Sequence, residues 1–519
     1  MPRRRPLIPS RPTPPRARNQ DNTGARTPAD RAHEPVTAVY EPKDRMRSDT
    51  GREPTQLAIT QETTTAAAPS YTKTVRPGAL PLLGHAPQFA RKPLDFLASL
   101  SAHGDLVRIK LGSHTAYAVC HPALVHQLLV ADRTFDKGGP IYDKLRDIGG
   151  NGLGTCPAAA HRRQRRRIQP VFHRDRMPGY ALLMSEEIAA LTSPWRHGQS
   201  IDVPAAMHRL TTAVTVRCLF DAGTDSSRLP ALQAHIDALT TGVTRRLVWP
   251  VPVLHRLPTP ANRRYERARR ELREITDTLI RDHRSTAGDR DNLMSVLTAP
   301  DANGAFLSDT EVHDQVISFL LAGVESTANV LAWAWHLIGS HPDVQRRLHA
   351  EADTVLAGRA ARPTDLDSLG LTGRVVTETL RLYPPDSLMT RTTTTDTVLG
   401  GHLLRAGTTV IYSPYQLHRR ADVYPEPDRF DPDRWRDIGK PPPGTWVPFG
   451  GGPRKCIADT FAHNQATLTL ATIAAHWQLS PTPGQQVRPA GQAVLAPHQL
   501  SMRLLHRRTT PHRDTGGRG

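Results

Sequence analysis

The stretch FGGGPRKCIAD, which runs from Phe449 to Asp459, decides how the rest of this chain is interpreted. It contains Cys456, one of only 4 cysteines among 519 residues. The three glycines before it permit positive φ angles and a close approach of the backbone to a bulky group. Arg454 and Lys455 favour the thiolate form of a neighbouring cysteine, as does the positive N-terminal end of the helix predicted to follow. The stretch therefore predicts an anionic sulfur that a rigid loop presents to a flat or metallic group.

An axial ligand to haem iron is one role for such a sulfur, and a buried structural cysteine beside a glycine turn is another. The remaining cysteines, Cys120, Cys156 and Cys218, are scattered along the chain, and no pair has the C-x-x-C spacing. This usage favours neither a zinc ribbon nor a disulfide framework. It is typical of proteins in a reducing, cytoplasmic compartment, where we expect this chain to act.

Residues 76–508 are expected to form one large domain between two disordered tails. Residues 1–75 are rich in Pro, Arg, Thr and Ala and lack apolar periodicity, and residues 509–519 form a short polar end. Such compositions predict disorder. A prior of about 150 residues per domain would suggest about three domains, but no break in composition divides the chain after residue 76. The net charge of +18 permits an anionic partner, and part of it lies in the N-terminal tail.

Helical patterns dominate the chain beyond this tail. The most apolar long stretch, Val316–Gly339, is interrupted by Glu325, Asn329 and His336, which makes it a poor membrane span and a predicted buried helix. The stretches DLVRIKLG and TAYAVC predict two short strands, and VLGGHLLRAGTTVIYSPY (residues 398–415) predicts a hairpin. The predicted helices cover residues 122–131, 161–171, 179–191, 261–283, 309–338, 344–356, 372–383 and 459–477.

The cysteine stretch resembles the signature F-x-x-G-x-R-x-C-x-G of the cytochrome P-450 haem-thiolate monooxygenases. Phe449, Gly452, Arg454 and Cys456 match it, while Ala458 replaces the final glycine. The resemblance implies a single mainly α domain with small β-sheets, in which haem b is buried between a long central helix and the cysteine loop. It also implies that Cys456 is the axial ligand of the iron, that Phe449 packs beside the sulfur and that Arg454 pairs with a haem propionate.

A second match is ETLR, which places Glu378 and Arg381 at positions i and i+3 on one helix face. Alone, such a pair is most often a solvated surface interaction worth under about 1 kcal/mol. The later stretch PEPDRFDPDRW, which contains Arg434, extends the match. The resemblance implies that these three side chains form a buried ion network behind the haem, with a structural rather than a chemical role.

A third match, AGVEST, lies inside the long central helix at residues 322–327. A glycine there costs about 1 kcal/mol relative to alanine, so a packing or functional reason is expected. One interpretation is a kink whose hydroxyl groups bond to preceding carbonyl oxygens. The resemblance instead implies an oxygen-binding groove in which Glu325 and Ser326 deliver protons to dioxygen. Ser326 stands where threonine is usual in the family, and Thr327 is a substitute hydroxyl donor.

The densest basic run, HRRQRRRIQPVF, begins at His161. A nucleic-acid surface and a solvated face are two interpretations, but the run lacks flanking aromatics that could stack on bases, and no nucleic-acid partner is expected. The resemblance implies that His161 and Arg165 bind haem propionates, together with Arg391, which follows a Pro-Pro turn. The other arginines of the run would form a cationic face for an acidic electron donor.

The resemblance extends from about Arg76 to Leu505 and implies that one atom of O2 enters a hydrophobic small molecule while the other becomes water. No G-x-G-x-x-G occurs in a β-α-β context, so electrons are expected from separate proteins, a ferredoxin-type donor and its reductase. A monomer without a membrane span is expected. The candidate substrate-lining residues are Phe319, Leu320, Ala322, Gly323, Leu388 and Met389.

Stretches such as GGPIYDK and LPTPANRRYERAR are similar to those of bacterial terpene-oxidising members of the family. They imply a sesquiterpene substrate and a place in secondary metabolism, including antibiotic biosynthesis. A polyketide or another secondary metabolite is the alternative substrate. A haem protein that catalyses no net oxygenation is a further alternative, which the serine at position 326 favours.

Overall fold

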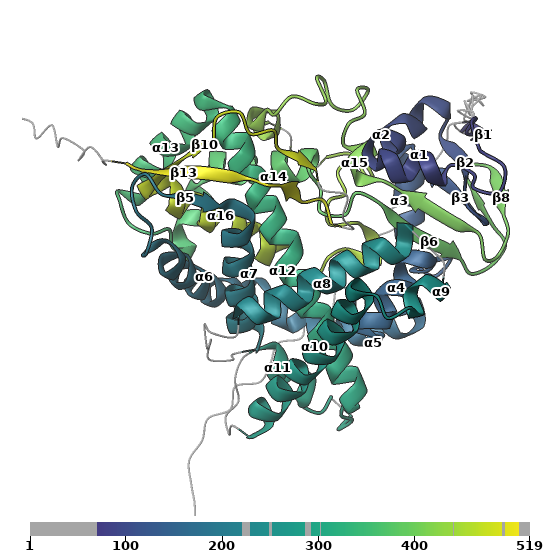
Figure 1. Ribbon diagram of the computed structural model, residues 1–519, viewed down its shortest axis with the longest axis horizontal. Coiled ribbons are helices and arrows are strands. Elements are labelled where there is room, and N and C mark those ends of the chain that lie inside the picture. The colour runs from purple at the N-terminus through teal and green to yellow at the C-terminus, as the bar shows by residue number, and fades with distance from the viewer. Residues whose placement is uncertain are drawn as a thin grey trace, which may run out of the picture. The chain divides into compact units, whose positions relative to one another are not determined.

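The computed structural model describes residues 70–507, except for residues 221–228, 249–251, 286–291, 302, 438, 440 and 490–493. The predicted tails lie outside the described residues apart from residues 70–75, and residue 508 of the predicted domain is not described either. Lys73–Val75 forms a strand and not part of a disordered tail, because it pairs with residues 106–108. The described residues belong to one compact unit, Ala68–Gly519, whose elements are shown in Figure 1.

Helices make up most of this unit, which confirms the expected mainly α fold. The α-helices are α1 (Ala86–Arg91), α2 (Pro93–Ala98), α3 (Pro122–Val130), α4 (Pro140–Gly149), α5 (Ala158–Ile168), α6 (Met177–Thr192), α7 (Val203–Phe220), α8 (Leu229–Val248), α9 (Pro252–Arg256), α10 (Pro260–Ser285), α11 (Leu293–Thr298), α12 (Asp309–Ser340), α13 (Pro342–Leu356), α14 (Gly370–Leu382), α15 (Pro414–Leu417) and α16 (Asp459–His476). The 3-10 helices are η1 (Ser99–His103), η2 (Gln169–Phe172), η3 (Arg174–Arg176), η4 (Pro363–Ser368), η5 (Pro432–Trp435) and η6 (Gly452–Arg454).

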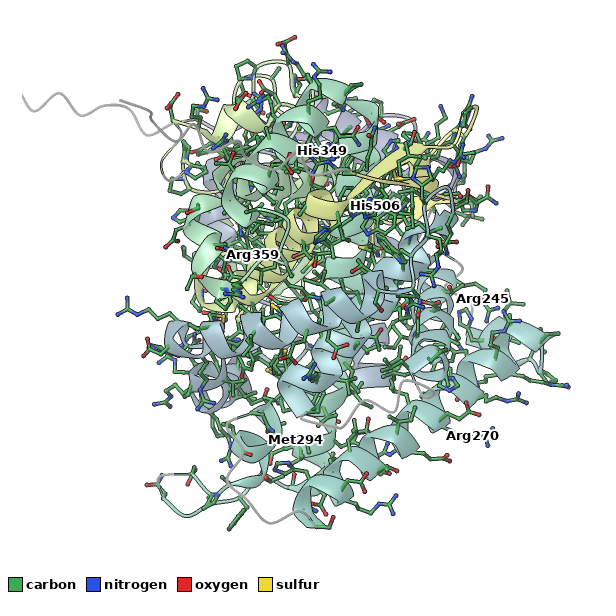
Figure 2. The ribbon with its side chains drawn as sticks, turned by 90° about the vertical axis from the view of Figure 1, so that its left-hand side faces the viewer. Arg245, Arg270, Met294, His349, Arg359 and His506 are labelled. Carbon is green, nitrogen blue, oxygen red and sulfur yellow. The ribbon has the colours of Figure 1, made fainter. Side chains whose placement is uncertain are left out.

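All eight predicted helices are present, and their ends differ from the prediction by at most three residues. The sequence does not predict α7, because this helix is buried on nearly all sides and therefore has no amphipathic period. By contrast, α10 has buried residues at helical spacing between exposed ones. Its Arg270 is exposed, as Figure 2 shows, while Met294 of the neighbouring α11 is buried in the core.

The largest sheet has the strand order β1-β2-β3-β9-β6-β4. The two strands predicted first, β2 and β3, pair antiparallel, as expected for consecutive strands. The hairpin predicted at residues 398–415 is right only in its first half. There β7 pairs with β8, but β9 joins the large sheet between β3 and β6. The strands are β1 (Lys73–Val75), β2 (Leu106–Leu111), β3 (His114–Val119), β4 (Phe135–Asp136), β5 (Ser200–Asp202), β6 (Met389–Thr393), β7 (Thr397–Leu399), β8 (His402–Leu404), β9 (Thr409–Tyr412), β10 (Trp477–Pro481), β11 (Arg488–Pro489), β12 (Pro497–His498) and β13 (Ser501–His506).

The central helix α12 organises the core. It begins with a capping box, in which the Ser308 hydroxyl accepts from the Glu311 amide and the Glu311 carboxylate accepts from the Ser308 amide. It packs against α7, α10, α14 and α16, and its Trp333 and Trp335 are fully buried. By length and composition α12 could cross a membrane, but 72% of its most apolar window is buried inside the protein. This burial agrees with the predicted core helix.

Candidate active site

Close backbone contacts hold the cysteine loop in place. Cys456 lies between η6 and α16, and its amide donates a 2.9 Å hydrogen bond to the carbonyl oxygen of Phe449. Gly450 and Gly452 have φ angles of 68° and 61°, which favour glycine. A Cβ atom on Gly452 would lie 2.1 Å from the carbonyl oxygen of Leu129 in α3. Gly452 therefore permits a close approach of the cysteine loop to the backbone of α3.

The exposure of Cys456 sets it apart from the other cysteines. It is exposed, whereas Cys120, Cys156 and Cys218 are buried, and all 4 are free thiols. Nevertheless, burial by surrounding protein is the main cause of a raised pKa at the Cys456 thiol. The accessible surface of this sulfur therefore faces a hollow inside the molecule rather than its outer surface.

This raised pKa corrects the expectation that the neighbouring cations favour thiolate in the chain itself. Lys455 pairs with Asp459 and not with the sulfur. Arg454 points to Asp136, to which its Nη2 donates a hydrogen bond of 2.7 Å. Burial therefore decides the pKa of Cys456. A metal cation bound to the sulfur would deprotonate it, because coordination outweighs such shifts.

Basic side chains from several segments converge beside the hollow. Arg391 in β6 and Arg454 are only 3% and 7% exposed. Burial, and then the charges of these two residues, lower the pKa of Lys137 to about 7. Burial, and then the charges of Arg454, Lys137 and Arg165, lower the pKa of His161 to about 3. These shifts reflect burial first and then neighbouring positive charge, which two carboxylates of a bound group would counter.

Further groups beside the hollow also fit a large planar cofactor. The hydroxyl of Tyr412 is buried without a hydrogen-bond partner and lies 3.9 Å from the position of a Cβ atom on Gly450. The buried Nε1 atom of Trp446 lacks a partner too, and its ring meets Phe449 edge-on at 6.1 Å. Asp386 is exposed, yet burial raises the pKa of its carboxyl group. These residues, with Cys456 and the basic cluster, fit haem.

The AGVEST segment lies in an uninterrupted part of α12. A Cβ atom on Gly323 would lie 2.9 Å from Oγ1 of Thr215, so the glycine permits close packing of α12 on α7. The Ser326 hydroxyl donates a 2.8 Å hydrogen bond to the carbonyl oxygen of Ala322. Ala322 is exposed although it lies mid-helix in the core. Ala322 and Ser326 therefore present accessible surface from the middle of α12, whereas Gly323 serves helix packing.

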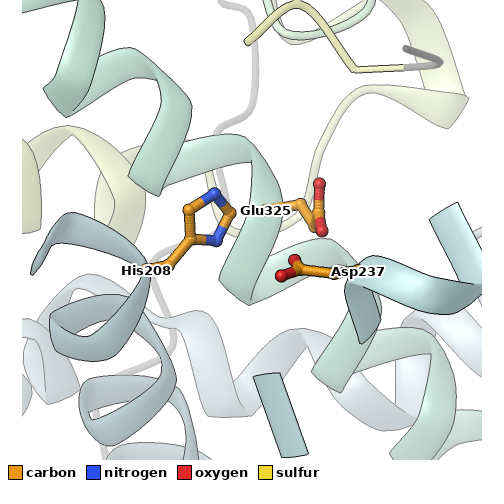
Figure 3. A group of neighbouring side chains, drawn as sticks. All are labelled: His208, Asp237 and Glu325. Atoms are coloured by element: carbon orange, nitrogen blue, oxygen red, sulfur yellow. The ribbon is translucent and has the colours of Figure 1, made fainter. Parts of the chain in front are cut away.

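Glu325 points in a different direction from Ser326. It is 5% exposed, and its Oε1 accepts a hydrogen bond of 3.3 Å from the hydroxyl of Thr240 in α8. Figure 3 shows its carboxyl group beside Asp237 of α8 and His208 of α7. Glu325 and Ser326, the predicted acid and hydroxyl, therefore do not form a direct hydrogen bond in this conformation. The reason is that adjacent residues on a helix point about 100° apart. Thr327 is buried.

Glu378, Arg381 and Arg434 meet in a buried network. The Glu378 and Arg381 side chains have no exposed surface and share two hydrogen bonds of 2.8 Å. The remaining donors of Arg381 bond to the carbonyl oxygens of His418, Pro427 and Arg429, so all five guanidinium donors are used. Arg434 lies 3.5 Å from Glu378.

Two residues that the sequence does not identify complete this network. The Trp435 indole donates a 2.8 Å hydrogen bond to Glu378. His418 is fully buried, and its Nε2 accepts from the amide of Val447, which places the imidazole proton on Nδ1, facing the carbonyl oxygen of Arg381. Burial, and then the charge of Arg381, lower the His418 pKa to about 3, so the ring stays neutral. The His418 ring therefore links Arg381 of α14 to Val447, which lies just before the cysteine loop.

The candidate substrate-lining residues divide into two groups. Leu320 has no exposed surface, and Phe319 stacks on Phe172 within the core at 5.6 Å, so these two offer a bound molecule little surface in this conformation. Leu388 and Met389, at the start of β6, are partly exposed. The sequence does not single out the partly exposed Leu321, because only the packing of α12 distinguishes it from Leu320.

The basic run forms α5, but its arginines serve different ends. His161 is buried on the inner face, and Arg165 bonds to the carbonyl oxygen of Lys455 in the cysteine loop. Arg163 pairs with Glu311. Arg167 donates to carbonyl groups that include those of Val296 and Ala299 near α11. The expected cationic face is therefore smaller than the run suggests, since two of its arginines fasten neighbouring segments.

An open concavity of about 650 Å³ lies beside the end of α5. Arg166 and Gln169 line it, and Gln169 also accepts a 2.9 Å hydrogen bond from Arg165. Because Arg165 contacts the cysteine loop, this concavity adjoins the part of the molecule that carries Cys456. The remaining lining residues are Pro170, His173, Asp175 and Arg176.

Comparisons with known proteins agree with this geometry. The family model described as Cytochrome P450 matches residues 75–503. A Cyclooctatin synthase of Streptomyces melanosporofaciens is 46% identical over 437 residues, which cover 83% of this chain and 95% of that protein. A Cyclooctat-9-en-7-ol 5-monooxygenase of the same species is 43% identical and covers 80% and 91%. A Pentalenene oxygenase of Streptomyces avermitilis is 43% identical and covers 83% and 97%.

Proposed function

This chain belongs to the cytochrome P450 family, and from this premise we propose that it inserts oxygen from O2 into a cyclic terpene hydrocarbon or terpene alcohol. Members of this family are haem-thiolate monooxygenases, so the protein is an oxidoreductase that uses haem and O2. The observation that carries the chemistry is the inward-facing sulfur of Cys456 at the start of α16, which packs against α12. The names of the similar proteins support the substrate class.

Cys456 would ligate the haem iron, and Lys137, His161, Arg165 and Arg391 would surround the propionates. Bound haem activates O2, with electron density from the thiolate favouring O–O cleavage. Arg454 is already paired with Asp136, so only part of its positive charge would act on the propionates. The same pair would hold the cysteine loop against the segment that carries Asp136. The role of the chain is to hold these groups in a water-poor hollow, where electrostatic interactions are strong.

An apolar wall supports a greasy substrate. Ala322 presents a methyl group from α12, and Leu388 and Met389 present partly exposed surface at the start of β6. Asp386 is the acidic residue of the segment before β6; burial raises the pKa of its carboxyl group, and the charge of Lys137 lowers it. A carboxyl group can hydrogen-bond a substrate hydroxyl in either protonation state. A terpene hydrocarbon or its alcohol suits such a wall.

An optical titration of the ferric protein with cyclic sesquiterpene hydrocarbons, including pentalenene, and with larger terpene alcohols tests this proposal. The expected result is a saturable low-spin to high-spin shift with at least one terpene. A protein with an intact thiolate signature that shifts with no terpene would contradict the substrate class. The search would then turn to polyketides and other secondary metabolites.

A second candidate function is a haem protein without net oxygenation. The serine at position 326 favours it, because serine lacks the methyl group that restricts the side-chain rotamer of threonine. Product formation that requires both O2 and a reductant would exclude this function. Product formed without either one would support it.

We infer further that a ferredoxin-type protein supplies the electrons. The concavity beside Arg166 and the exposed Arg162 support docking of an acidic partner next to the cysteine loop. A monomer in the bacterial cytoplasm is consistent with four free cysteines and with donors of this kind.

A further inference from the structure

Three titratable side chains meet beside α12, outside the residues that would hold the haem. His208 comes from α7, Asp237 from α8 and Glu325 from α12, and Figure 3 shows them facing one another. One ligand atom from each lies within 4.8 Å of the other two. Helix α12 packs against α7, and α7 against α8, so three elements hold the cluster in place. No part of the site described above uses Asp237 or His208.

The cluster contains two carboxyl groups but no strong cation. Among the described residues, no lysine or arginine forms an ion pair with Asp237 or Glu325. Two carboxylates at this separation repel each other, and one proton shared between them removes the repulsion. The cluster therefore favours a retained proton.

The titration behaviour of the cluster agrees with this geometry. Burial, and then the charge of Asp237, raise the pKa of Glu325 to about 7. Burial also raises the pKa of Asp237 and lowers that of His208. Near neutral pH the imidazole is therefore neutral, with one nitrogen that donates and one that accepts, and the carboxyl pair holds a proton that it can release.

The charged groups that face the cluster are few. Asp237 acts on Glu325 from α8, and Thr240 of the same helix donates a hydrogen bond to it. Asp237 and Asp202, at the end of β5, act on His208 from outside α7, and Asn329 faces it from α12. From the described parts of α10, α14 and α16, no charged group contributes to the shift of Glu325.

Exposure falls along the cluster toward the interior. Asp237 is exposed, His208 is half-buried and Glu325 is only 5% exposed. The next residue after Glu325 is Ser326, whose hydroxyl belongs to the surface of α12 that faces the hollow. The carboxyl group of Glu325 needs only rotation about its side-chain bonds to turn from Asp237 toward Ser326. The three groups thus lie between solvent and the hollow.

We propose that His208, Asp237 and Glu325 form a proton relay from solvent to the Ser326 face of α12. The inference rests on the proposed function, because monooxygenation consumes protons: RH + O2 + 2 e⁻ + 2 H⁺ gives ROH + H2O, with the electrons from the redox partner. A proton passes from water to Asp237, which His208 faces within 4.8 Å, and from Asp237 to Glu325. Glu325 then turns and releases it beside Ser326, and returns as a carboxylate to accept the next proton.

The first test needs no turnover and uses the intact ferric holoprotein. Infrared difference spectra below and above pH 7 should contain the C=O band of a protonated carboxyl group that shifts in D2O. Glu325→Gln should remove this band, and Asp237→Asn should shift its midpoint to lower pH, because the repelling charge of residue 237 is gone. Glu274→Gln, which changes an exposed carboxyl group on α10, is the matched control and should leave the band unchanged.

The second test measures the relay during turnover with a terpene that gives the spin shift. Asp237→Asn should lower product formed per O2 consumed about a hundredfold, the lower end of what proton-transfer groups contribute, with an increased solvent isotope effect. Asp237→Glu should restore coupling, whereas the spin shift and the Glu274→Gln control should stay at wild-type values. His208→Gln should retain more coupling than His208→Phe.

Three results would overturn the relay. The first is a carboxyl band that survives in Glu325→Gln and is untouched in Asp237→Asn. The second is unchanged coupling and isotope effect in Asp237→Asn. The third is a stoichiometric divalent metal in the purified protein that Asp237→Asn removes, which would make the cluster a metal site. If no terpene supports turnover, the proposed substrate fails, but the infrared test still decides whether the carboxyl pair holds a proton.

Discussion

Glu378 and Arg381 lie one turn apart on α14 and are joined by two hydrogen bonds of 2.8 Å, with no exposed surface on either side chain. The amide of Asp431 and the indole of Trp435 also donate to Glu378. On an isolated helix such a pair would contribute little to stability. Here it is buried, and it joins α14 to the segment before the cysteine loop.

Removing one partner of this pair should destabilise the protein strongly. Glu378→Gln would leave the Arg381 charge buried without its counter-ion, and we expect the free energy of unfolding to fall by about 3–5 kcal/mol. Haem content at a given expression level should fall with it. Chemical denaturation and haem quantification measure both effects. Asp95→Asn, in the exposed Lys92–Asp95 pair, is the control and should change neither. Equal stability of both variants would show that the network is dispensable.

Cys456→Ser should abolish the thiolate signature of the reduced carbon monoxide complex, because serine does not supply the anionic sulfur ligand. Cys218→Ala should preserve the signature, since Cys218 is buried in α7 with a raised pKa that keeps it a thiol. Absorption spectra of both purified variants provide the measurement. A thiolate signature in Cys456→Ser would remove the central assignment of the site.

Haem retention should depend on pH through Lys137. In the chain itself the Lys137 pKa is lowered to about 7, and a bound carboxylate would raise it. Haem binding then takes up a proton, so retention should be best below pH 7 and should weaken as the pH rises above 7. Haem transfer to apomyoglobin measures the loss.

Lys137→Met separates this effect from general pH sensitivity. The variant should lose haem faster than the wild type near pH 7, and its rate of loss should depend less on pH above that value. Lys144→Met, which changes a half-buried lysine of α4 that pairs with Asp147, is a matched control. A wild-type rate of haem loss in Lys137→Met would place the propionates away from this side chain.

Ser326→Ala should uncouple the reaction without weakening substrate binding. The Ser326 hydroxyl is the polar group that α12 presents next to Ala322, and a proton-transfer group of this kind contributes about a hundredfold or more. We expect peroxide release to rise and product per O2 to fall, while the spin shift stays unchanged. Ser326→Thr keeps the hydroxyl and should retain coupling. If Ser326→Ala remains fully coupled, Thr327 or a water molecule supplies the proton instead.

Arg166→Glu should slow reduction by a ferredoxin-type donor. Reversal of one charge at the concavity beside the cysteine loop should lower the rate about tenfold at low salt, and added salt should narrow the difference. Stopped-flow reduction measures the rate, and haem content should stay unchanged. Arg270→Glu on α10 is the control with the same change in net charge. Equal rates for both variants would place the donor elsewhere.

The parts of this protein that depend on local chemistry could be predicted from the sequence. The order of glycines, cations and cysteine in residues 449–459 indicates the ligand loop, and ETLR indicates a charged pair on one helix face. The amphipathic or strongly apolar patterns of α10, α12 and α14 predict these helices nearly to their ends. Local spacing is sufficient in these cases because the interacting atoms lie within one or two turns of the same element.

The directions of the charged side chains depend on contacts between distant segments. Arg454 turns to Asp136, which lies 318 positions earlier, and Glu325 turns toward Asp237 and His208 from two helices whose sequences single out neither residue. Burial likewise raises the pKa of Cys456, against the expectation from its neighbours in sequence. Desolvation and contacts between distant segments arise only when helices pack, so no local pattern in the chain encodes the direction of these side chains.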